Sequence, residues 1–190
     1  METNQALALI ENMILSAKRE IKDNGFYYMF WGYLVFLSAI TDYIMLMMNH
    51  PKHALVWAIA MPFGGLVSII KGIKDKKKQT TITYIDEMFR HLMIAFTISL
   101  FIVCFIMPMT QNNWRSFFPT LMVVYAFALF VSGGILRFKP LQYGALAVWA
   151  LGAIAFFMPY QHQLLLLAAG VLAGFVVPEH LLNMLFKKNV

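Results

Sequence analysis

The sequence predicts an all-α fold, namely a polytopic membrane bundle of six transmembrane helices in three hairpins, preceded by an N-terminal amphipathic helix. Hydrophobic residues make up 61% of the 190 residues, charged residues only 13%, and the mean hydropathy is +0.68. A soluble domain carries about 25% charged and about 45–50% apolar residues. Several apolar runs also reach the roughly 18 residues that mark a membrane span. Such spans must be helical, because lipid offers no partners for free backbone N–H and C=O groups.

The first element is an amphipathic helix within residues 1–25. Its apolar residues recur at helical spacing, at Ala6, Leu9, Ile10, Met13, Ile14, Ala17 and Ile21. A helix of this kind lies in the membrane interface or docks on a partner. It is not a secretory signal, because it opens with Glu2 and has neither a compact apolar region nor a small-residue cleavage site.

Residues 26–190 are predicted to form a single transmembrane domain. Its six spans are expected near residues 26–48, 54–71, 92–109, 117–136, 141–159 and 163–182. Most connectors are short, so successive spans would be antiparallel neighbours. The exception is the connector between the second and third spans, which begins with the basic segment 71–81.

The distribution of cations predicts the orientation. If the N-terminus is cytoplasmic, thirteen of the 15 Lys and Arg residues lie on that side, namely Lys18, Arg19, Lys22, Lys71, Lys74, Lys76, Lys77, Lys78, Arg90, Arg137, Lys139, Lys187 and Lys188. Only Lys52 and Arg115 lie outside. This positive-inside pattern predicts that both termini are cytoplasmic. It also argues against nucleic acid as a partner, because the cations sit at the ends of apolar spans rather than on a soluble domain.

Glycines near the inner ends of the second, fourth and sixth spans predict close helix packing. They are Gly64, Gly65, Gly133, Gly134, Gly170 and Gly174. Small residues let neighbouring helices converge, either within the bundle or in a dimer with a second copy of the chain. In the stretch "SGGILRFKP", residues 132–140, the glycines precede Arg137 and Lys139. We interpret this stretch as a turn at the membrane surface, with contact to a phosphate headgroup as the alternative.

Asp42 is the only acidic residue well inside an apolar run, toward the outer end of the first span. A charge at the centre of a membrane helix costs about 2.5–3.5 kcal/mol or more, so such residues point to function. The sequence leaves two interpretations open. Asp42 is either an interfacial carboxylate within reach of Lys52, or a proton or cation site. The lack of any other carboxylate near the middle of a span argues against an ion-coupled transporter.

A second set of polar residues is expected at the cytoplasmic surface. Its members are Asp86, Glu87, Arg90, His91, Arg137, Lys139, Glu179 and His180. Asp86 with Arg90, and Glu87 with His91, are four residues apart and can pair along one helix. Two interpretations remain. These residues are ordinary surface pairs, or they converge into a polar mouth for an anionic ligand or a partner.

Signals for catalysis or cofactor binding are weak. Cys104 lies in an apolar run, where a thiol is inert. His50, His53 and His162 share the outer side, but without Cys ligands or a His–Glu pattern on a helix they do not predict a metal site. Zinc-protease, nucleotide-loop and dinucleotide-binding patterns are absent. We therefore expect no catalytic, cofactor-binding or metal-binding residues, and a protein that is not an enzyme.

Several strings resemble a family of small six-span membrane proteins of Bacteroidetes-type bacteria. They are "FYYMFWGYLVF", "MPFGGLVSIIKGIK", "TYIDE", "FVSGGILRFKP" and "QLLLLAAGVLAGFVVPEHLL", and they run through nearly the whole chain. The family carries no known activity, substrate or cofactor. The resemblance implies a bacterial source and an inner-membrane location.

One function hypothesis and one alternative follow. The first is a non-enzymatic integral membrane protein that acts through its basic cytoplasmic face. Its partners would be the bilayer, in particular anionic headgroups, and a cytoplasmic or membrane protein. The alternative is a small-solute transporter or channel, with a path lined by Ser38, Thr97, Ser99, Tyr125 and Ser132.

Overall fold

The protein is an all-α helical bundle. The computed structural model describes residues 26–76, 84–109, 114–178 and 180. It contains six helices, and no strand occurs in these described ranges. The predicted amphipathic helix within residues 1–25 lies outside the described residues.

The helices follow one another with short connections. The first helix spans Phe26–Met47. It is followed by α2 (Leu55–Lys76), α3 (Tyr84–Phe101), α4 (Trp114–Ile135), α5 (Lys139–Ala155) and α6 (Tyr160–Val171). Two helices change their winding toward their C-terminal ends. A π-helical segment, Ile102–Ile106, and a short 3-10 segment, Met107–Met109, extend α3, and a π-helical segment, Leu172–Val176, extends α6.

Four helices are long and apolar enough to cross a membrane, namely Phe26–Met47, Leu55–Lys74, Glu87–Ile106 and Arg115–Ile135. This confirms the prediction of a membrane helical bundle, but it does not establish the predicted number of six spans. The predicted ends were less accurate. The second helix continues beyond residue 71 to Lys76. The helix α3 begins at Tyr84, so it includes the residues from Asp86 to His91 that were expected to share one helix. Charged side chains favour helix as well as apolar ones do, so hydropathy marks only the apolar part of each helix.

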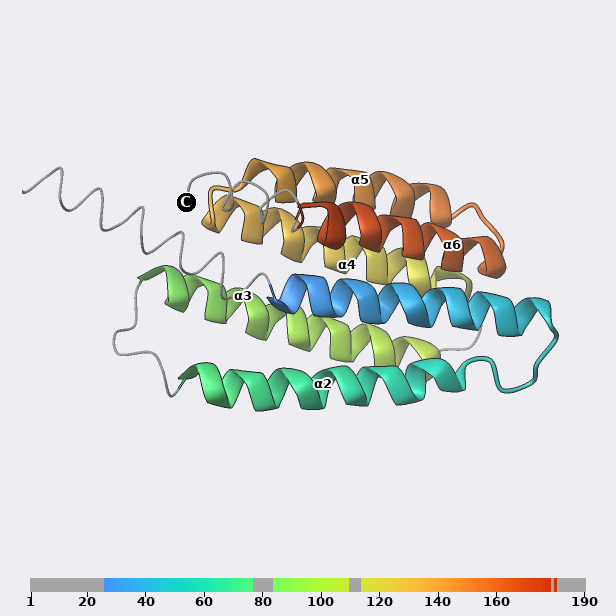
Figure 1. The fold of residues 1–190 in the computed structure, drawn as a ribbon. Coiled ribbons are helices and arrows are strands. Elements are labelled where there is room, and N and C mark those ends of the chain that lie inside the picture. The colour runs from blue at the N-terminus through green and yellow to red at the C-terminus, as the bar shows by residue number, and fades with distance from the viewer. Residues whose placement is uncertain (1–25, 77–83, 110–113, 179, 181–190) are drawn as a thin grey trace, which may run out of the picture.

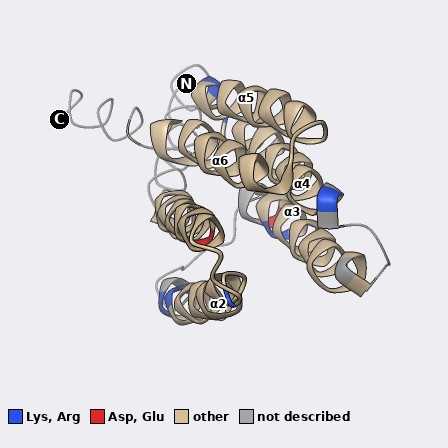
Figure 2. Cartoon of the chain, turned by 90° about the vertical axis from the view of Figure 1, so that its right-hand side faces the viewer, with Lys and Arg blue, Asp and Glu red and all other residues tan. Residues whose placement is uncertain are grey.

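The helices run side by side along one axis, as Figure 1 shows. Viewed down that axis, α4, α5 and α6 cluster together, whereas α2 and α3 lie at the edge of the bundle (Figure 2). The most extensive contact is between α4 and α5, and α3 packs against α4. The first helix lies between α2 and the C-terminal part of α6. Its Trp31 indole donates to Ser68 in α2, and its Tyr28 ring lies 6.2 Å from that of Phe175.

The core lies between α4, α5 and α6. Met122, Leu164 and Leu167 are at most 1% exposed. Small residues allow this close approach. A Cβ atom at Gly174 would lie 2.7 Å from Val148, and one at Gly170 would lie 3.1 Å from Met122.

The other predicted packing glycines differ in their surroundings. A Cβ at Gly64 would lie 2.6 Å from Leu34, and one at Gly133 would lie 2.8 Å from the Gln142 side chain. Gly134 has ordinary space, with its nearest such neighbour at 3.5 Å, and Gly65 has no neighbour within 4 Å. Gly65 therefore faces away from the packed interior.

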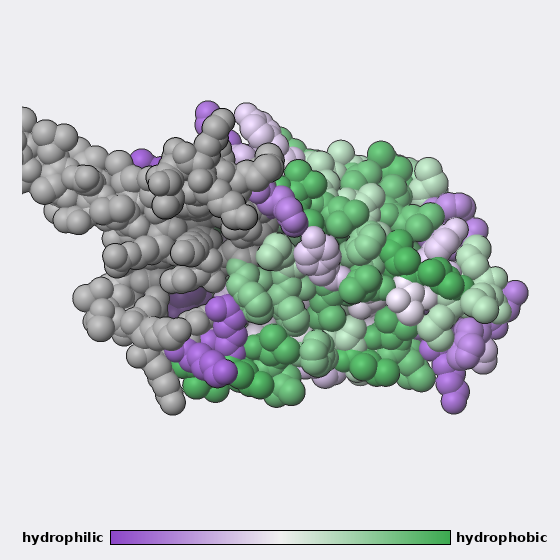
Figure 3. All heavy atoms as spheres, in the orientation of Figure 1, coloured by the Kyte–Doolittle hydropathy of each residue, from purple (hydrophilic) through white to green (hydrophobic). Residues whose placement is uncertain are grey.

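The outer surface carries a band of apolar side chains. Figure 3 shows this band along the helices, with hydrophilic residues gathered toward the end of the bundle at the right of the view. Large exposed hydrophobic residues are concentrated on α2 and α3, and they include Ile59, Phe63, Ile69, Ile98, Phe101 and Phe105. An apolar belt with polar ends is the surface expected of a membrane protein.

The first helix and α4 end in the same kind of backbone turn. Asn49 and Arg137 both adopt a left-handed conformation, with φ of 54° and 51°. After the first helix, the N–H of His50 donates to the Met45 carbonyl. After α4, the N–H of Phe138 donates to the Gly133 carbonyl. Both are Schellman caps, which close the end of a helix with its own last carbonyl groups.

Candidate functional site

Asp42 is fully buried near the end of the first helix, at 0% exposure. The Schellman turn at Asn49 reverses the chain and returns it beside this residue. His53 then lies with its Nδ1 2.6 Å from Asp42 Oδ1, and the Trp57 indole Nε1 donates to Asp42 Oδ2 over 2.8 Å. Each carboxylate oxygen therefore has its own partner, as a buried carboxylate requires. We call Asp42, His53 and Trp57 the Asp42 cluster, and the end of the bundle that carries it the Asp42 end.

Aromatic rings enclose this cluster. Phe118 of α4 lies between Trp57 and Tyr160, with ring centroids 5.7 Å and 5.3 Å away. Tyr160, the first residue of α6, also lies 6.3 Å from the His53 ring. The Asp42 cluster thus joins the first helix and α2 to the starts of α4 and α6.

The buried carboxylate of Asp42 contributes to a raised pKa of Tyr160. Burial and the negative charge of Asp42 together raise the pKa of the Tyr160 phenol to about 12. Both causes favour the neutral phenol. Tyr160 therefore stays protonated beside Asp42 across the physiological pH range.

The partner of Asp42 differs from the one expected. Lys52 was predicted to reach the carboxylate, whereas the contacts come from His53 and Trp57. His53 is also the part of the cluster open to solvent, because its side chain is 26% exposed and that of Asp42 is 0% exposed. An imidazole in this position can exchange protons with water while holding a buried carboxylate.

The histidines of this end do not assemble a metal centre in the described part of the chain. The Nδ1 atom of His50 accepts the backbone N–H of Lys52 over 3.2 Å. The Nδ1 atom of His53 is occupied by Asp42. Within residues 26–76, 84–109, 114–178 and 180, no group of three or more His, Cys, Asp or Glu side chains is placed to hold a metal ion.

The second candidate set lies at the opposite end of the bundle. Arg90 Nη2 lies 3.6 Å from Glu87 Oε1, and both side chains are more than half exposed. His91 Nδ1 contacts the backbone carbonyl of Glu87 at 2.8 Å, so its partner is the backbone rather than the expected carboxylate. The side chain of Asp86 is outside the described part of the structure. These are weak surface contacts within one helix.

The remaining members of this set lie on other elements. Arg137 occupies the left-handed position of the α4 cap, and Lys139 begins α5. His180 Nδ1 lies 3.0 Å from the Val176 carbonyl of its own helix. Glu179 lies outside the described residues. The turn after Gly134 joins the carbonyl end of α4 to the start of α5 at Lys139.

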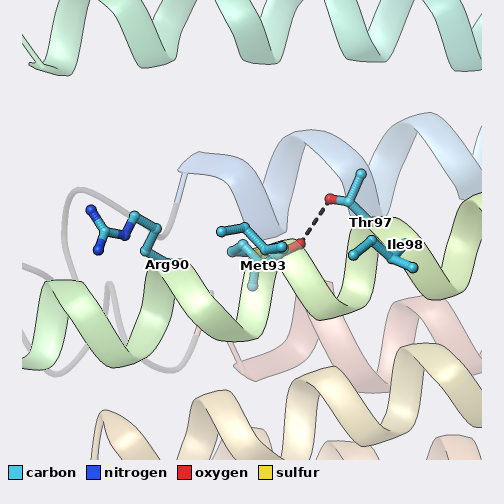
Figure 4. Close-up of a pocket in the computed structure, with 5 residues that line it drawn as sticks. Arg90, Met93, Thr97 and Ile98 are labelled. Atoms are coloured by element: carbon cyan, nitrogen blue, oxygen red, sulfur yellow. Dashed lines mark hydrogen bonds between the residues drawn. The ribbon is translucent and has the colours of Figure 1, made fainter.

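One face of α3 carries a shallow groove of about 330 Å³. Figure 4 shows Arg90, Met93, Thr97 and Ile98 along it. The Thr97 hydroxyl donates to the Met93 carbonyl over 2.8 Å, so it is satisfied within its own helix. The groove is therefore apolar along its length, with a cation at one end.

Gln163 is a buried polar residue that the sequence analysis missed. Its Nε2 contacts three backbone carbonyls, those of Arg115 at 2.7 Å, Met158 at 3.0 Å and Ala155 at 3.1 Å. It ties the first turn of α6 to the start of α4 and the end of α5. A glutamine at the start of an apolar run was the only signal, and it looks like an ordinary loop residue.

Comparison with protein-family models, with curated proteins and with solved structures finds no match.

Proposed function

We propose that the chain is an integral protein of the bacterial inner membrane that crosses the bilayer six times in three hairpins. Four helices meet the length and hydropathy expected of a span. The helix α5, with 17 residues, and α6 with its π-helical extension are shorter. Both run alongside α4 (Figure 1). A helix packed along a membrane span shares its depth, which supports six crossings.

The proposed orientation has both termini in the cytoplasm. At the Asp42 end, the cations of the described residues are Lys52 and Arg115. At the other end they include Lys71, Lys74, Arg90, Arg137 and Lys139. An excess of cations is typical of the cytoplasmic side. The Asp42 end would then face the periplasm.

The proposed activity is non-enzymatic, through contacts of the basic cytoplasmic face with anionic lipid headgroups and with a protein partner. One observation carries this proposal. The described polar side chains of the second candidate set contact only their own helices, as the exposed pair of Arg90 with Glu87 illustrates, and do not converge into a mouth. Exposed cations at the membrane surface attract anionic lipids by about 1 kcal/mol each.

The alternative of a small-solute transporter has weaker support. The π-helical segments in α3 and α6 favour it, since such segments often mark functional sites. Three of the hydroxyls that were proposed to line a path count against a transporter. Ser38, Thr97 and Ser99 each donate to a carbonyl four residues earlier in their own helix. A hydroxyl bonded in this way is less available to a solute.

A lipid-retention experiment tests the proposed function. The protein is purified from membranes, and co-purified phosphatidylglycerol is quantified by mass spectrometry. One variant combines Arg90→Gln, Arg137→Gln and Lys139→Gln, and the matched control combines Lys52→Gln and Arg115→Gln at the Asp42 end. We expect loss of bound phosphatidylglycerol in the first variant and retention in the control. Equal retention in both would overturn the proposal.

A further inference from the structure

The helix α2 is attached mainly to the first helix. Its contacts there include the Trp31–Ser68 hydrogen bond, Gly64 against Leu34, the Phe63 ring 6.4 Å from that of Phe30, and Lys71 over the Phe26 and Tyr27 rings. None of its contacts with α3, α5 or α6 is extensive. Only 6% of its apolar window is buried, against 50% for α4.

The Asp42 cluster is the attachment at the periplasmic end of the proposed topology. Trp57 on α2 donates to Asp42 on the first helix, and His53 just before α2 contacts the same carboxylate. Pro62 follows within α2. A proline inside a helix removes one backbone hydrogen bond and weakens the helix at that point. The segment Leu55–Met61 therefore carries one member of the cluster, Trp57, and ends at a weak point of the helix.

We propose that Asp42 and His53 form a proton-sensitive latch that holds the segment Leu55–Met61 of α2 against the first helix. His53 is the sensor, since its side chain is partly open to solvent while the carboxylate is fully buried. A hydrogen bond between an imidazolium and a carboxylate is roughly twice as strong as a neutral one. The latch is therefore stronger with a doubly protonated His53 than with a neutral one.

Groups from the first helix, α2, α4 and α6 surround the latch. From the first helix comes Asp42, and from α6 comes Tyr160, which stays neutral because its pKa is raised by burial and by Asp42. The rings from α2 and α4, Trp57 and Phe118, do not titrate. Histidine is the side chain that ordinarily changes charge between about pH 5 and 8. Within the loop, His50 Nδ1 accepts the backbone N–H of Lys52, and the hydrogen bonds described for the Asp42 carboxylate come from His53 and Trp57.

Distance measurements between two spin labels test the latch. Cys104 is exposed on the π-helical segment of α3 and is the only cysteine of the chain. Ile59 on α2 is 72% exposed, so Ile59→Cys provides the second site without disturbing the core. The doubly labelled protein is reconstituted in nanodiscs and measured by double electron–electron resonance at about pH 5.5 and about pH 8.5, on either side of the range in which histidine titrates.

We expect the distance distribution to broaden and to gain a second population at the higher pH. The variant His53→Asn tests whether protonation of residue 53 causes the change. Its amide nitrogen replaces Nδ1 as a donor to Asp42 but does not titrate, so the distribution should be the same at both pH values. His53→Ala should show the second population at both. An unchanged wild-type distribution, or a His53→Asn variant that responds to pH as the wild type does, would overturn the proposal.

The outcome does not depend on one variant folding. The wild-type comparison between the two pH values involves no change at the latch itself. A failure of this experiment leaves the lipid proposal intact, because that proposal concerns the opposite end of the bundle.

Discussion

Asp42 and Trp57 are joined by a hydrogen bond of 2.8 Å from the indole Nε1 to the carboxylate Oδ2, and this bond crosses from the first helix to α2. Since α2 packs mainly against the first helix, the pair contributes to the position of α2 as well as to the satisfaction of a buried charge. Two donors depend on the one carboxylate, because His53 shares it. The site is thus sensitive to loss of Asp42 in a way that most positions of the bundle are not.

Replacing Asp42 with Ala should destabilise the protein markedly. The change leaves His53 Nδ1 and Trp57 Nε1 without their acceptor, at a cost of about 1–3 kcal/mol for each buried group. Reversible unfolding in mixed micelles measures the loss. The control is Ser38→Ala on the same helix, where a buried hydroxyl is bonded only to the Leu34 carbonyl. That control should cost about 1 kcal/mol or less, and an equal loss in both variants would contradict the special role of Asp42.

The positions of the helices were well predicted, because apolar runs report which segments can be buried in lipid. The run that begins at Phe26 ends within a residue of its expected end. The inner end of α2 was predicted too early, for a physical reason. Lys, Asp, Glu and Arg continue a helix easily, and neither a proline nor a terminal glycine stops α2 at residue 71.

The candidate site was predicted in part. Asp42 stood out as a carboxylate inside an apolar run, but its partner depends on the turn that follows. Asn49 adopts φ of 54°, and the chain then returns with His53 rather than Lys52 beside the carboxylate. Adjacent residues in a loop cannot be told apart by sequence distance, since the backbone conformation decides which side chain faces inward.

Gly144 and Gly65 should respond in opposite ways to replacement by Ala. A Cβ at Gly144 would lie 2.9 Å from the Ala173 carbonyl oxygen and 3.0 Å from the Gly174 Cα. These are backbone atoms that cannot move aside, so α5 and α6 must separate, at a cost of about 1–3 kcal/mol. Gly65 has no neighbour within 4 Å, and Ala there should be neutral or should stabilise by about 0.5–1 kcal/mol. Thermal unfolding of the two variants in one detergent makes the comparison, and a stable Gly144→Ala protein would show that this contact is looser than described.

Replacing Gln163 with Leu should loosen the joint between α4, α5 and α6. The apolar side chain fills similar space but leaves the Arg115 and Met158 carbonyls without this donor, whereas the Ala155 carbonyl keeps the Met158 N–H. Each buried group that loses its partner costs about 1–3 kcal/mol. Gln163→Glu should be worse, because a carboxylate would face the same carbonyl oxygens. Hydrogen exchange measured by mass spectrometry over Arg115–Phe118 should rise in both variants, and unchanged protection would count against the proposed tie.

The stability of the protein should fall at high pH through Tyr160. Burial, and secondly the charge of Asp42, raise the pKa of this phenol to about 12, whereas a tyrosine in the unfolded chain has a pKa of about 10. The folded protein therefore holds this proton more tightly than the unfolded chain does. Its contribution is fully present below about pH 10 and is lost as the pH rises toward about 12.

Tyr160→Phe should remove this part of the pH dependence. The phenolate absorbance that is present in the wild type and absent from Tyr160→Phe should appear near the higher of the two pKa values. Asp42→Asn should lower that value only partway, since burial is the larger cause, and a return to the ordinary tyrosine value would reverse the order of the two causes.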